Sequence, residues 1–241
     1  TSTKVFVLEV MGRHAGWIAS SGGLAQQKQD DAPHIILFPE VPFQINKFLQ
    51  KVKDTVKRLG FCSIIVSEGV RQENGDFLTD NKGKDAFGHA QLGGAALYIA
   101  RLIEKELKLK NHWAVADYLQ RSARHIASKT DVEQAQAVGK HAVDLALMGK
   151  TSVMTTIKRI SNQPYTWSLD SVNLEKVANR EKMLPLEYIT PDGFGITNQC
   201  REYLTPLIEG EDYPVYLNGI PTYTVPKRNL IQKKIKNDFS I

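Results

Sequence analysis

The stretch VFVLEVMGR at residues 5–13 decides the fold. Its first six residues are almost all apolar, and a short apolar run of this kind is typical of a strand buried on both faces of a parallel sheet. Gly12 and Arg13 follow at once, where such a strand would end. The stretch therefore predicts a buried β-strand with a polar turn at its carboxyl end.

Similar runs recur through the first half of the chain and are separated by segments with helical spacing. Residues 34–38 are apolar and are stopped by Pro39. Residues 45–59 carry apolar side chains at intervals of three and four, and Gly60 follows them. The pattern predicts strands at 5–10, 34–38 and 61–66, and helices at 14–21 (ending at Gly22-Gly23), 45–59 and 92–107.

This alternation predicts an α/β fold, with a parallel-rich sheet and helices on both of its faces. In such sheets, ligands bind beyond the carboxyl ends of the strands. The segments in which to look for a site are therefore residues 11–14, 39–43 and 67–71.

The second half has a different pattern. An apolar run at residues 115–119 predicts a further strand. Thr130 and Glu133 have the spacing of a capping box, which predicts a helix through Leu147 that ends at Gly149. Residues 153–160 predict another strand. Proline and glycine recur beyond it, which indicates irregular segments with short helices.

The composition narrows the class of protein. The chain has 241 residues, of which 31 are basic and 26 acidic, and the net charge of +5 is mostly dispersed rather than gathered in one patch. The exceptions are Lys227-Arg228 and the lysines at 233, 234 and 236, for which a solvated surface is the simpler interpretation. We therefore expect no nucleic-acid partner. A modest positive charge suits a small anionic substrate.

The two cysteines indicate a reducing compartment. Two thiols in a chain of this length do not make a disulfide framework, and Cys62 lies in an apolar run as a small core residue. No apolar run is long enough to span a bilayer and no signal peptide opens the chain, so we expect a cytoplasmic protein with no membrane partner.

Polar groups follow three of the predicted strands. Gly12 and Arg13 follow the first, Glu68 follows the third, and Tyr118 and Arg121 lie in the next apolar segment. Guanidinium, hydroxyl and carboxylate groups together suit a phosphorylated polyol. For each group, the alternative is an ordinary turn or a surface charge. The spacing of His and Cys predicts no metal site.

These motifs resemble the phosphofructokinase family. Residues 9–13 (EVMGR) are similar to its fructose 6-phosphate motif, and residues 39–43, 66–69 and 118–122 occur in the family's order. Further segments resemble the bacterial pyrophosphate-dependent branch: 85–89, 177–182, 184–185 and 206–210.

The resemblance implies a role for each matching residue. Met11, Gly12 and Arg13 would contact fructose 6-phosphate, and Glu68 would hold a sugar hydroxyl. Tyr118 and Arg121 would bind the 6-phosphate; the ATP-dependent relatives usually have histidine in place of Tyr118. Lys4 and His112 stand where those relatives have arginines that reach a neighbouring subunit, and this departure puts their cross-subunit role in question.

The resemblance also implies what lies elsewhere. The family's Gly-rich donor loop and its Thr-Ile-Asp-x-Asp segment, which carries the catalytic base, do not occur in these 241 residues. We therefore expect no catalytic base in this chain. Mg²⁺ and pyrophosphate would be held mainly by an N-terminal half of the same protein. Alone, the chain would be inactive.

For the intact protein, the resemblance implies pyrophosphate-dependent phosphorylation of fructose 6-phosphate to fructose 1,6-bisphosphate in glycolysis, by a homo-oligomer. The alternatives are an ATP-dependent phosphofructokinase, a non-catalytic regulatory half, or a generic sugar-phosphate-binding protein. The implied division is a sugar-phosphate domain at 1–120, a segment at 121–185 that packs with the donor domain, and a returning segment at 186–241. Part of the apolar face of the helix at 131–148 would then be exposed in this chain.

Overall fold

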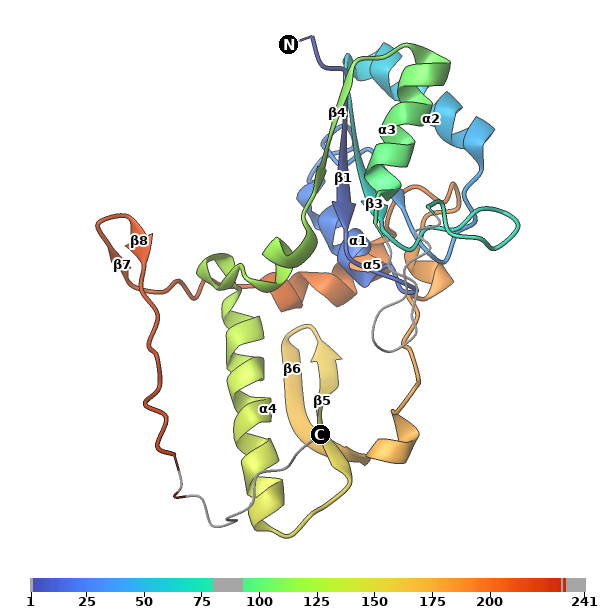
Figure 1. The fold of residues 1–241 in the computed structure, drawn as a ribbon. Coiled ribbons are helices and arrows are strands. Elements are labelled where there is room, and N and C mark those ends of the chain that lie inside the picture. The colour runs from blue at the N-terminus through green and yellow to red at the C-terminus, as the bar shows by residue number, and fades with distance from the viewer. Residues whose placement is uncertain (1, 80–92, 231, 233–241) are drawn as a thin grey trace.

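A computed structural model describes residues 2–79, 93–230 and 232 of the chain. Its centre is a four-stranded sheet in which all neighbouring strands run parallel (Figure 1). The order of the strands is β2 (Ile35–Leu37), β3 (Cys62–Ser67), β1 (Val5–Val10) and β4 (Asn111–Val115). The expected parallel α/β architecture is confirmed, and the stretch that opens at Val5 is one of the two central strands.

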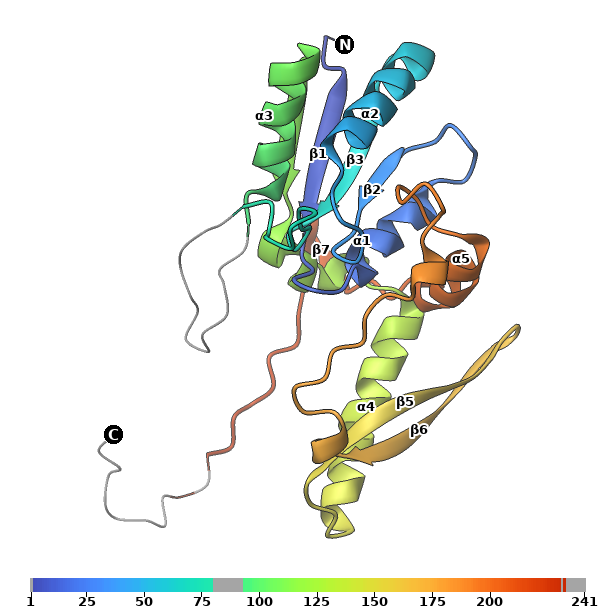
Figure 2. The ribbon, with the colours of Figure 1, turned by 90° about the vertical axis from the view of Figure 1, so that its right-hand side faces the viewer.

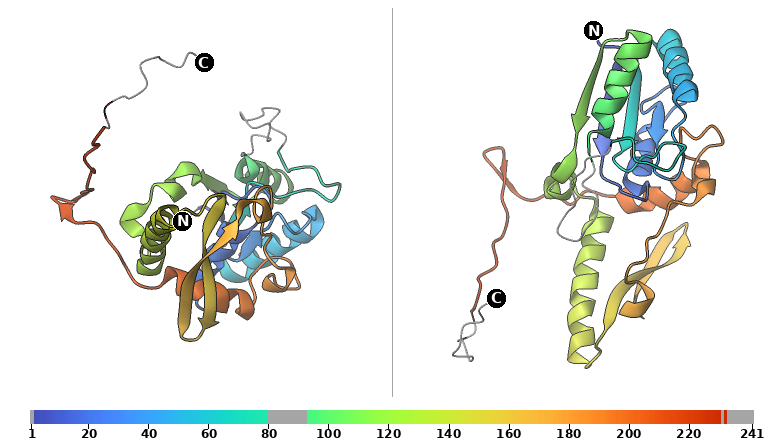
Figure 3. Two further views of the ribbon diagram at one scale, coloured as in Figure 1. Left: turned by 90° about the horizontal axis from the view of Figure 1, so that it is seen from below. Right: turned by 45° about the vertical axis from the view of Figure 1, so that its right-hand side comes forward.

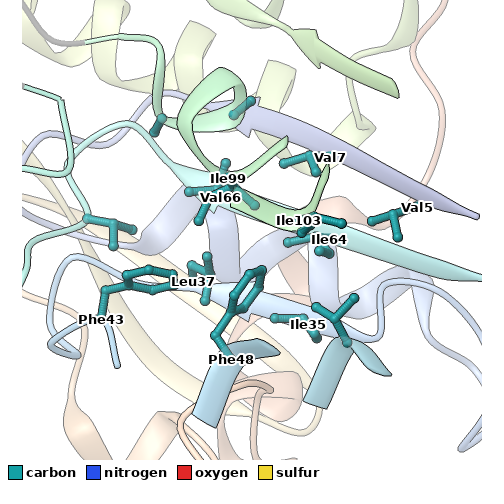
Figure 4. Close-up of a cluster of buried hydrophobic side chains, with 14 of the residues drawn as sticks. Val5, Val7, Ile35, Leu37, Phe43, Phe48, Ile64, Val66, Ile99 and Ile103 are labelled. Carbon is teal, nitrogen blue, oxygen red and sulfur yellow. The ribbon is translucent and has the colours of Figure 1, made fainter. Parts of the chain in front are cut away.

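Helices cover both faces of this sheet (Figure 2). On one face, α2 (Ile45–Leu59) and α3 (Ala95–Leu107) pack over Val5, Val7 and Val66. Figure 4 shows this core, with Phe43 and Phe48 on one side of the cluster. On the other face, α1 (Trp17–Gly22) and α5 (Asn198–Leu204) pack over the alternate side chains of the same strands: Val10, Ile36, Phe38 and Ile65.

Both cysteines belong to these cores. Cys62 lies under α2 and α3, and Cys200 is a residue of α5 on the opposite face; both thiols are free and buried. Burial raises the pKa of the Cys62 thiol to about 12 and that of Cys200 to about 11. The prediction that Cys62 is a small core residue is confirmed.

Two of the helix boundaries differ from those expected. The helix α1 begins at Trp17 rather than His14, and it continues without a left-handed break into a 3₁₀ turn at Gly23–Ala25. Gly22 and Gly23 both have right-handed φ values, and each packs closely, Gly22 against the side chain of Ile65 and Gly23 against that of Ile196. The helix α3 begins at Ala95, and Leu92 lies outside the described residues, as do residues 85–89 and the lysines at 233, 234 and 236.

The strand expected at residues 115–119 was placed wrongly. The strand β4 occupies Asn111–Val115, and Asp117–Arg121 forms a 3₁₀ turn. As an edge strand that pairs only with β1, β4 leaves Trp113 and Val115 exposed, so it lacks the apolar run that marks a buried strand. The chain turns at Asp117, whose φ of 42° is incompatible with a strand.

Below the sheet, a second layer is built from α4 (Lys129–Leu147) and an antiparallel hairpin, β5 (Val153–Asn162) and β6 (Tyr165–Asn173). The strand β6 was not expected. Half-buried and exposed residues alternate along β6 from Tyr165 to Asp170. The helix α4 contacts this strand, and Gln134 donates a hydrogen bond to the hydroxyl of Tyr165 at 2.7 Å. Val143 and Leu147 on the outer side of α4 are exposed, as expected for part of this face.

The expected capping box at the beginning of α4 is also wrong. The N-cap is Ser128, whose hydroxyl accepts a hydrogen bond from the amide of Asp131 at 3.1 Å. Thr130 lies inside the first turn, and its hydroxyl bonds the carbonyl of Glu209. Serine and threonine can both cap a helix. Here the Thr130 hydroxyl is bonded to the carbonyl of Glu209, and Ser128 caps the helix.

The chain then returns to the sheet. A segment through the 3₁₀ turns at Leu174–Lys176 and Leu186–Tyr188 leads to α5 and a 3₁₀ turn at Thr205–Ile208. A small hairpin, β7 (Tyr216–Leu217) and β8 (Ile220–Pro221), stands apart from both layers (Figure 3). Within the described ranges, no helix is long and apolar enough to cross a membrane. The division at residues 120 and 185 stays a prediction.

Candidate functional site at the carboxyl ends of the strands

The loop after β1 is bonded to the turn after β3. The amide of Gly12 donates to a carboxylate oxygen of Glu68 at 3.1 Å. In return, the carbonyl of Gly12 accepts from the Ser67 hydroxyl at 2.7 Å and from the amide of Gly69 at 3.0 Å. The Gly12 amide therefore holds the Glu68 carboxylate in place.

Glycine is required at both positions of this contact. Gly12 has a φ of 149°, and a Cβ there would lie 2.5 Å from the Ser67 hydroxyl oxygen. A Cβ on Gly69 would overlap the backbone carbonyl of Arg13. The two turns approach so closely only because neither carries a side chain, and this brings Glu68 and Arg13 to one edge of the sheet.

The end of β4 completes the edge. The side-chain oxygen of Gln120 accepts a hydrogen bond from the amide of Met11 at 3.4 Å, which joins the 3₁₀ turn at 117–121 to the end of β1. The side chains of Tyr118 and Arg121 are exposed on this turn, and the guanidinium of Arg121 lies 5.3 Å from the centre of the Tyr118 ring. Gln120 was not among the expected site residues.

Arg121 also faces the second layer of the protein. It lines an open groove together with Ile18 and Ser21 of α1 and with Ser128 and Asp131 at the beginning of α4. A small anion bound at Arg121 would therefore lie in the groove between the sheet layer and the layer of α4.

Behind this edge, a buried carboxylate links β1 to α3. Glu9 is 2% exposed, and its two oxygens accept hydrogen bonds from the amides of Gly94 at 3.2 Å and Ala96 at 2.8 Å. Burial raises the pKa of Glu9, and the neighbouring charge of Glu68 adds to the effect. The sequence signal for this link between β1 and α3 was a single charged residue, Glu9, inside the otherwise apolar run of residues 5–10.

Further contacts tie the loop after β1 to the returning segment. The Nδ1 atom of His14 lies 2.6 Å from a carboxylate oxygen of Glu181, and the indole of Trp17 donates to the carbonyl of Lys182 at 2.7 Å. One oxygen of Glu40 accepts from the amides of both Gly16 and Leu184 at 2.9 Å. Sequence reasoning singled out residues 39–43 as a place to look, but it assigned no role to Glu40.

Lys4 and His112 lie at a distance from this edge. Lys4 precedes β1 at its amino end, and His112 pairs with Phe6 near the same end of the sheet. Both side chains are exposed. They cannot join Met11 and Glu68 within one chain, and a role across a subunit boundary stays a prediction.

The arrangement can bind and orient an anionic, hydroxylated molecule. Arg13 and Arg121 offer charged donors, Tyr118 offers a hydroxyl, and Glu68 offers an acceptor. In the part of the chain that the structure describes, no three His, Cys, Asp or Glu side chains gather to hold a metal ion.

Comparisons with known proteins show the family of the chain. The family description "Phosphofructokinase" matches residues 1–146. The chain is 55% identical over 98% of its length to a pyrophosphate–fructose 6-phosphate 1-phosphotransferase of Halomonas elongata, and 54% identical over its whole length to one of Methylococcus capsulatus. It covers 56% and 57% of these relatives, so it spans little more than half their length.

A solved structure is similar as well. The crystal structure of a pyrophosphate-dependent phosphofructokinase from Marinobacter aquaeolei superimposes with a TM-score of 0.86 and is 50% identical. The match covers 100% of this chain and 57% of that one. The similarity therefore includes α4, the hairpin and the returning segment as well as the parallel sheet.

Proposed function

Because the chain belongs to the phosphofructokinase family, we propose that it is the C-terminal, fructose 6-phosphate-binding portion of a pyrophosphate:fructose-6-phosphate 1-phosphotransferase. The observation that carries the proposal is the bonded junction of Gly12 and Glu68, placed beside Arg13 and the exposed pair of Tyr118 and Arg121. These groups sit at the edge where parallel sheets bind ligands.

Each group has a distinct task in this proposal. Arg121 and Tyr118 bind the 6-phosphate, since a guanidinium and a phenol supply donors to its oxygens. Glu68 accepts from a sugar hydroxyl with the oxygen that the Gly12 amide leaves available. The backbone at Met11 and Gly12 and the side chain of Arg13 border the sugar.

The chemistry itself belongs to the longer protein. Phosphoryl transfer depends on positioning and on charge stabilisation, and this portion contributes the positioning of the 1-hydroxyl. The donor loop and the catalytic aspartate are absent from these 241 residues. Magnesium would be held with pyrophosphate mainly by the remaining portion, as the family resemblance implies.

The proposal extends to the setting of the enzyme. We place it in the cytoplasm, as a glycolytic homo-oligomer that interconverts fructose 6-phosphate and fructose 1,6-bisphosphate. Lys4 and His112 at the amino end of the sheet would reach the sugar phosphate of a neighbouring subunit.

Two measurements test the proposal. The full-length protein is assayed for fructose 6-phosphate phosphorylation with pyrophosphate and, separately, with ATP, and the 241-residue chain is assayed in parallel. We expect turnover with pyrophosphate in the full-length protein and none in the isolated chain. A clear preference for ATP would assign the protein to the ATP-dependent branch. Absence of turnover with either donor would favour a regulatory half.

A further inference from the structure

Residues 181–184 of the returning segment cross the loop that follows β1. We name these four residues the strap. In the ribbon it belongs to the stretch that leads from β6 back toward α5 (Figure 2). The strap is held by three side-chain contacts to residues that precede it by more than 140 positions. Two of the contacts reach residues 14–17, directly after Arg13. The third reaches the carboxylate of Glu40, which is also bonded to Gly16.

The central contact is the carboxylate of Glu40. Its Oε1 atom accepts two backbone hydrogen bonds of 2.9 Å, one from Gly16 at the end of the loop after β1 and one from Leu184 at the end of the strap. Its Oε2 atom is buried, with no hydrogen-bond partner among the described residues. A Cβ on Gly16 would come within 2.8 Å of that oxygen, so the carboxylate fits closely between the two segments.

Two more contacts close the strap over the loop. His14 lies 2.6 and 2.8 Å from the two carboxylate oxygens of Glu181, and Trp17 donates to the carbonyl of Lys182. The ammonium of Lys182 lies 5.3 Å from the ring centres of both Trp17 and Tyr203. The loop that carries Arg13 is thus fixed at its far end by charge, hydrogen bonds and aromatic packing together.

The strap is also joined to the second layer. Arg159 of β5 donates to the carbonyl of Tyr203 at 2.8 Å, and its guanidinium lies 4.1 Å from the ring centre of that residue. The hydroxyl of Tyr203 in turn accepts from Lys182 at 3.2 Å. A continuous set of contacts therefore runs from the hairpin through Tyr203 and the strap to the loop after β1.

We propose that Glu40 is a positioning residue for the acceptor site: by binding the amides of Gly16 and Leu184, it holds the strap against the loop and fixes Arg13 for the sugar phosphate. Glu40 does not touch the substrate in this role. The inference rests on the proposed function, because it concerns the affinity for fructose 6-phosphate.

The chemistry of the contact defines a matched pair of variants. In Glu40→Gln, the amide oxygen can still accept both backbone hydrogen bonds, so the strap stays in place. In Glu40→Ala, two buried amides lose their acceptor and the loop is released. Glu187→Ala is the control, since it removes an exposed glutamate in the 3₁₀ turn that follows the strap.

The experiment uses the full-length protein and two readouts, amide hydrogen exchange at Gly16 and Leu184 and steady-state kinetics. For Glu40→Ala we expect exchange at both amides to rise about 10-fold or more and the KM for fructose 6-phosphate to rise about 10-fold. The KM for pyrophosphate should stay within about 2-fold, and Glu40→Gln and Glu187→Ala should resemble the wild type in every readout.

The outcomes separate this role from the proposed function. An active wild type in which Glu40→Ala leaves the KM for fructose 6-phosphate unchanged would overturn the positioning role alone, even with faster exchange. A wild type that neither turns over nor binds fructose 6-phosphate would overturn both proposals.

A second variant guards against a folding failure of Glu40→Ala. Glu181 is exposed, so Glu181→Ala should fold normally while it releases His14. We expect the KM for fructose 6-phosphate to rise about 3-fold, as for the loss of one ordinary hydrogen bond. An unchanged KM in this variant would count against the strap as a positioning device.

Discussion

The backbone amide of Gly12 donates a hydrogen bond to the carboxylate of Glu68 at 3.1 Å, across 56 residues of sequence. This bond joins the carboxyl ends of two neighbouring parallel strands, β1 and β3. It sets the direction of the Glu68 carboxylate in the proposed sugar site.

Replacement of Glu68 should weaken acceptor binding. In Glu68→Ala, the Gly12 amide loses its acceptor and the sugar loses a hydrogen-bond partner, so we expect the KM for fructose 6-phosphate to rise about 10- to 100-fold. Glu68→Gln keeps an oxygen for Gly12 and should show a smaller rise. Steady-state kinetics of the full-length protein with varied fructose 6-phosphate measure both. Equal kinetics in Glu68→Ala and wild type would contradict the assignment.

Replacement of Arg121 should act on phosphate binding without loss of stability. The side chain is exposed, so we expect Arg121→Ala to change the free energy of unfolding by less than about 0.5 kcal/mol. Loss of a charged hydrogen bond to phosphate should raise the KM for fructose 6-phosphate about 10-fold or more. Tyr118→Phe should have a smaller effect of the same kind. Arg101→Ala, an exposed arginine on α3, is the control and should leave the KM unchanged.

A methyl group at Gly69 should destabilise the protein. A Cβ there overlaps the carbonyl of Arg13, and neither backbone can move without breaking the junction with Gly12. We expect Gly69→Ala to lower the free energy of unfolding by about 3 kcal/mol.

The matched control is Gly139→Ala. This glycine lies inside α4 with open space around its Cβ position, so alanine there should raise stability by about 0.5–1 kcal/mol. Urea unfolding of the two variants compares them. A Gly69→Ala variant as stable as Gly139→Ala would show that the turns after β1 and β3 are not in close contact.

The buried Glu9 should make stability depend on pH. Because burial raises the pKa of this carboxyl in the folded state, its contribution favours folding below its ordinary value of 4.5 and is lost as the pH rises through the raised folded value. Glu9→Gln removes this titration. We therefore expect its stability relative to wild type to improve as the pH is raised from about 4 to about 7. Urea unfolding across this range measures the difference, and a constant difference would refute the effect.

The parallel sheet could be predicted because its evidence is local. The run at Cys62–Ser67 is almost wholly buried, and the run at Val5–Val10 is buried except for Phe6 and half-buried Leu8, so each strand carries its own signal. The helix at Ile45–Leu59 was predicted to the residue, since its apolar side chains recur at helical spacing and Gly60 follows with a left-handed φ of 84°. The edge strand β4 and the strand β6 were missed or misplaced, because neither is buried on both faces.

The candidate site was only partly predictable, for a related reason. The types of residue at the strand ends pointed to Gly12, Glu68 and Arg121, since ligands bind there in any parallel sheet. Residues 39–43 and 118–122 were singled out, but Gln120 and Glu40 bond backbone amides of distant segments, and their sequence neighbours do not show that role.

The sequence by itself determined the class of fold, the order of its central elements and the chemistry available at one edge of the sheet, because burial and glycine turns act over a few residues. The tertiary structure alone decided which of these groups meet. The Gly12 amide is bound to Glu68 rather than left for a ligand. Glu40 accepts hydrogen bonds from the amides of Gly16 and Leu184, which lie 168 positions apart in the sequence. Hydrogen bonds between distant segments depend on how the layers pack, and only the packed chain brings their partners within reach.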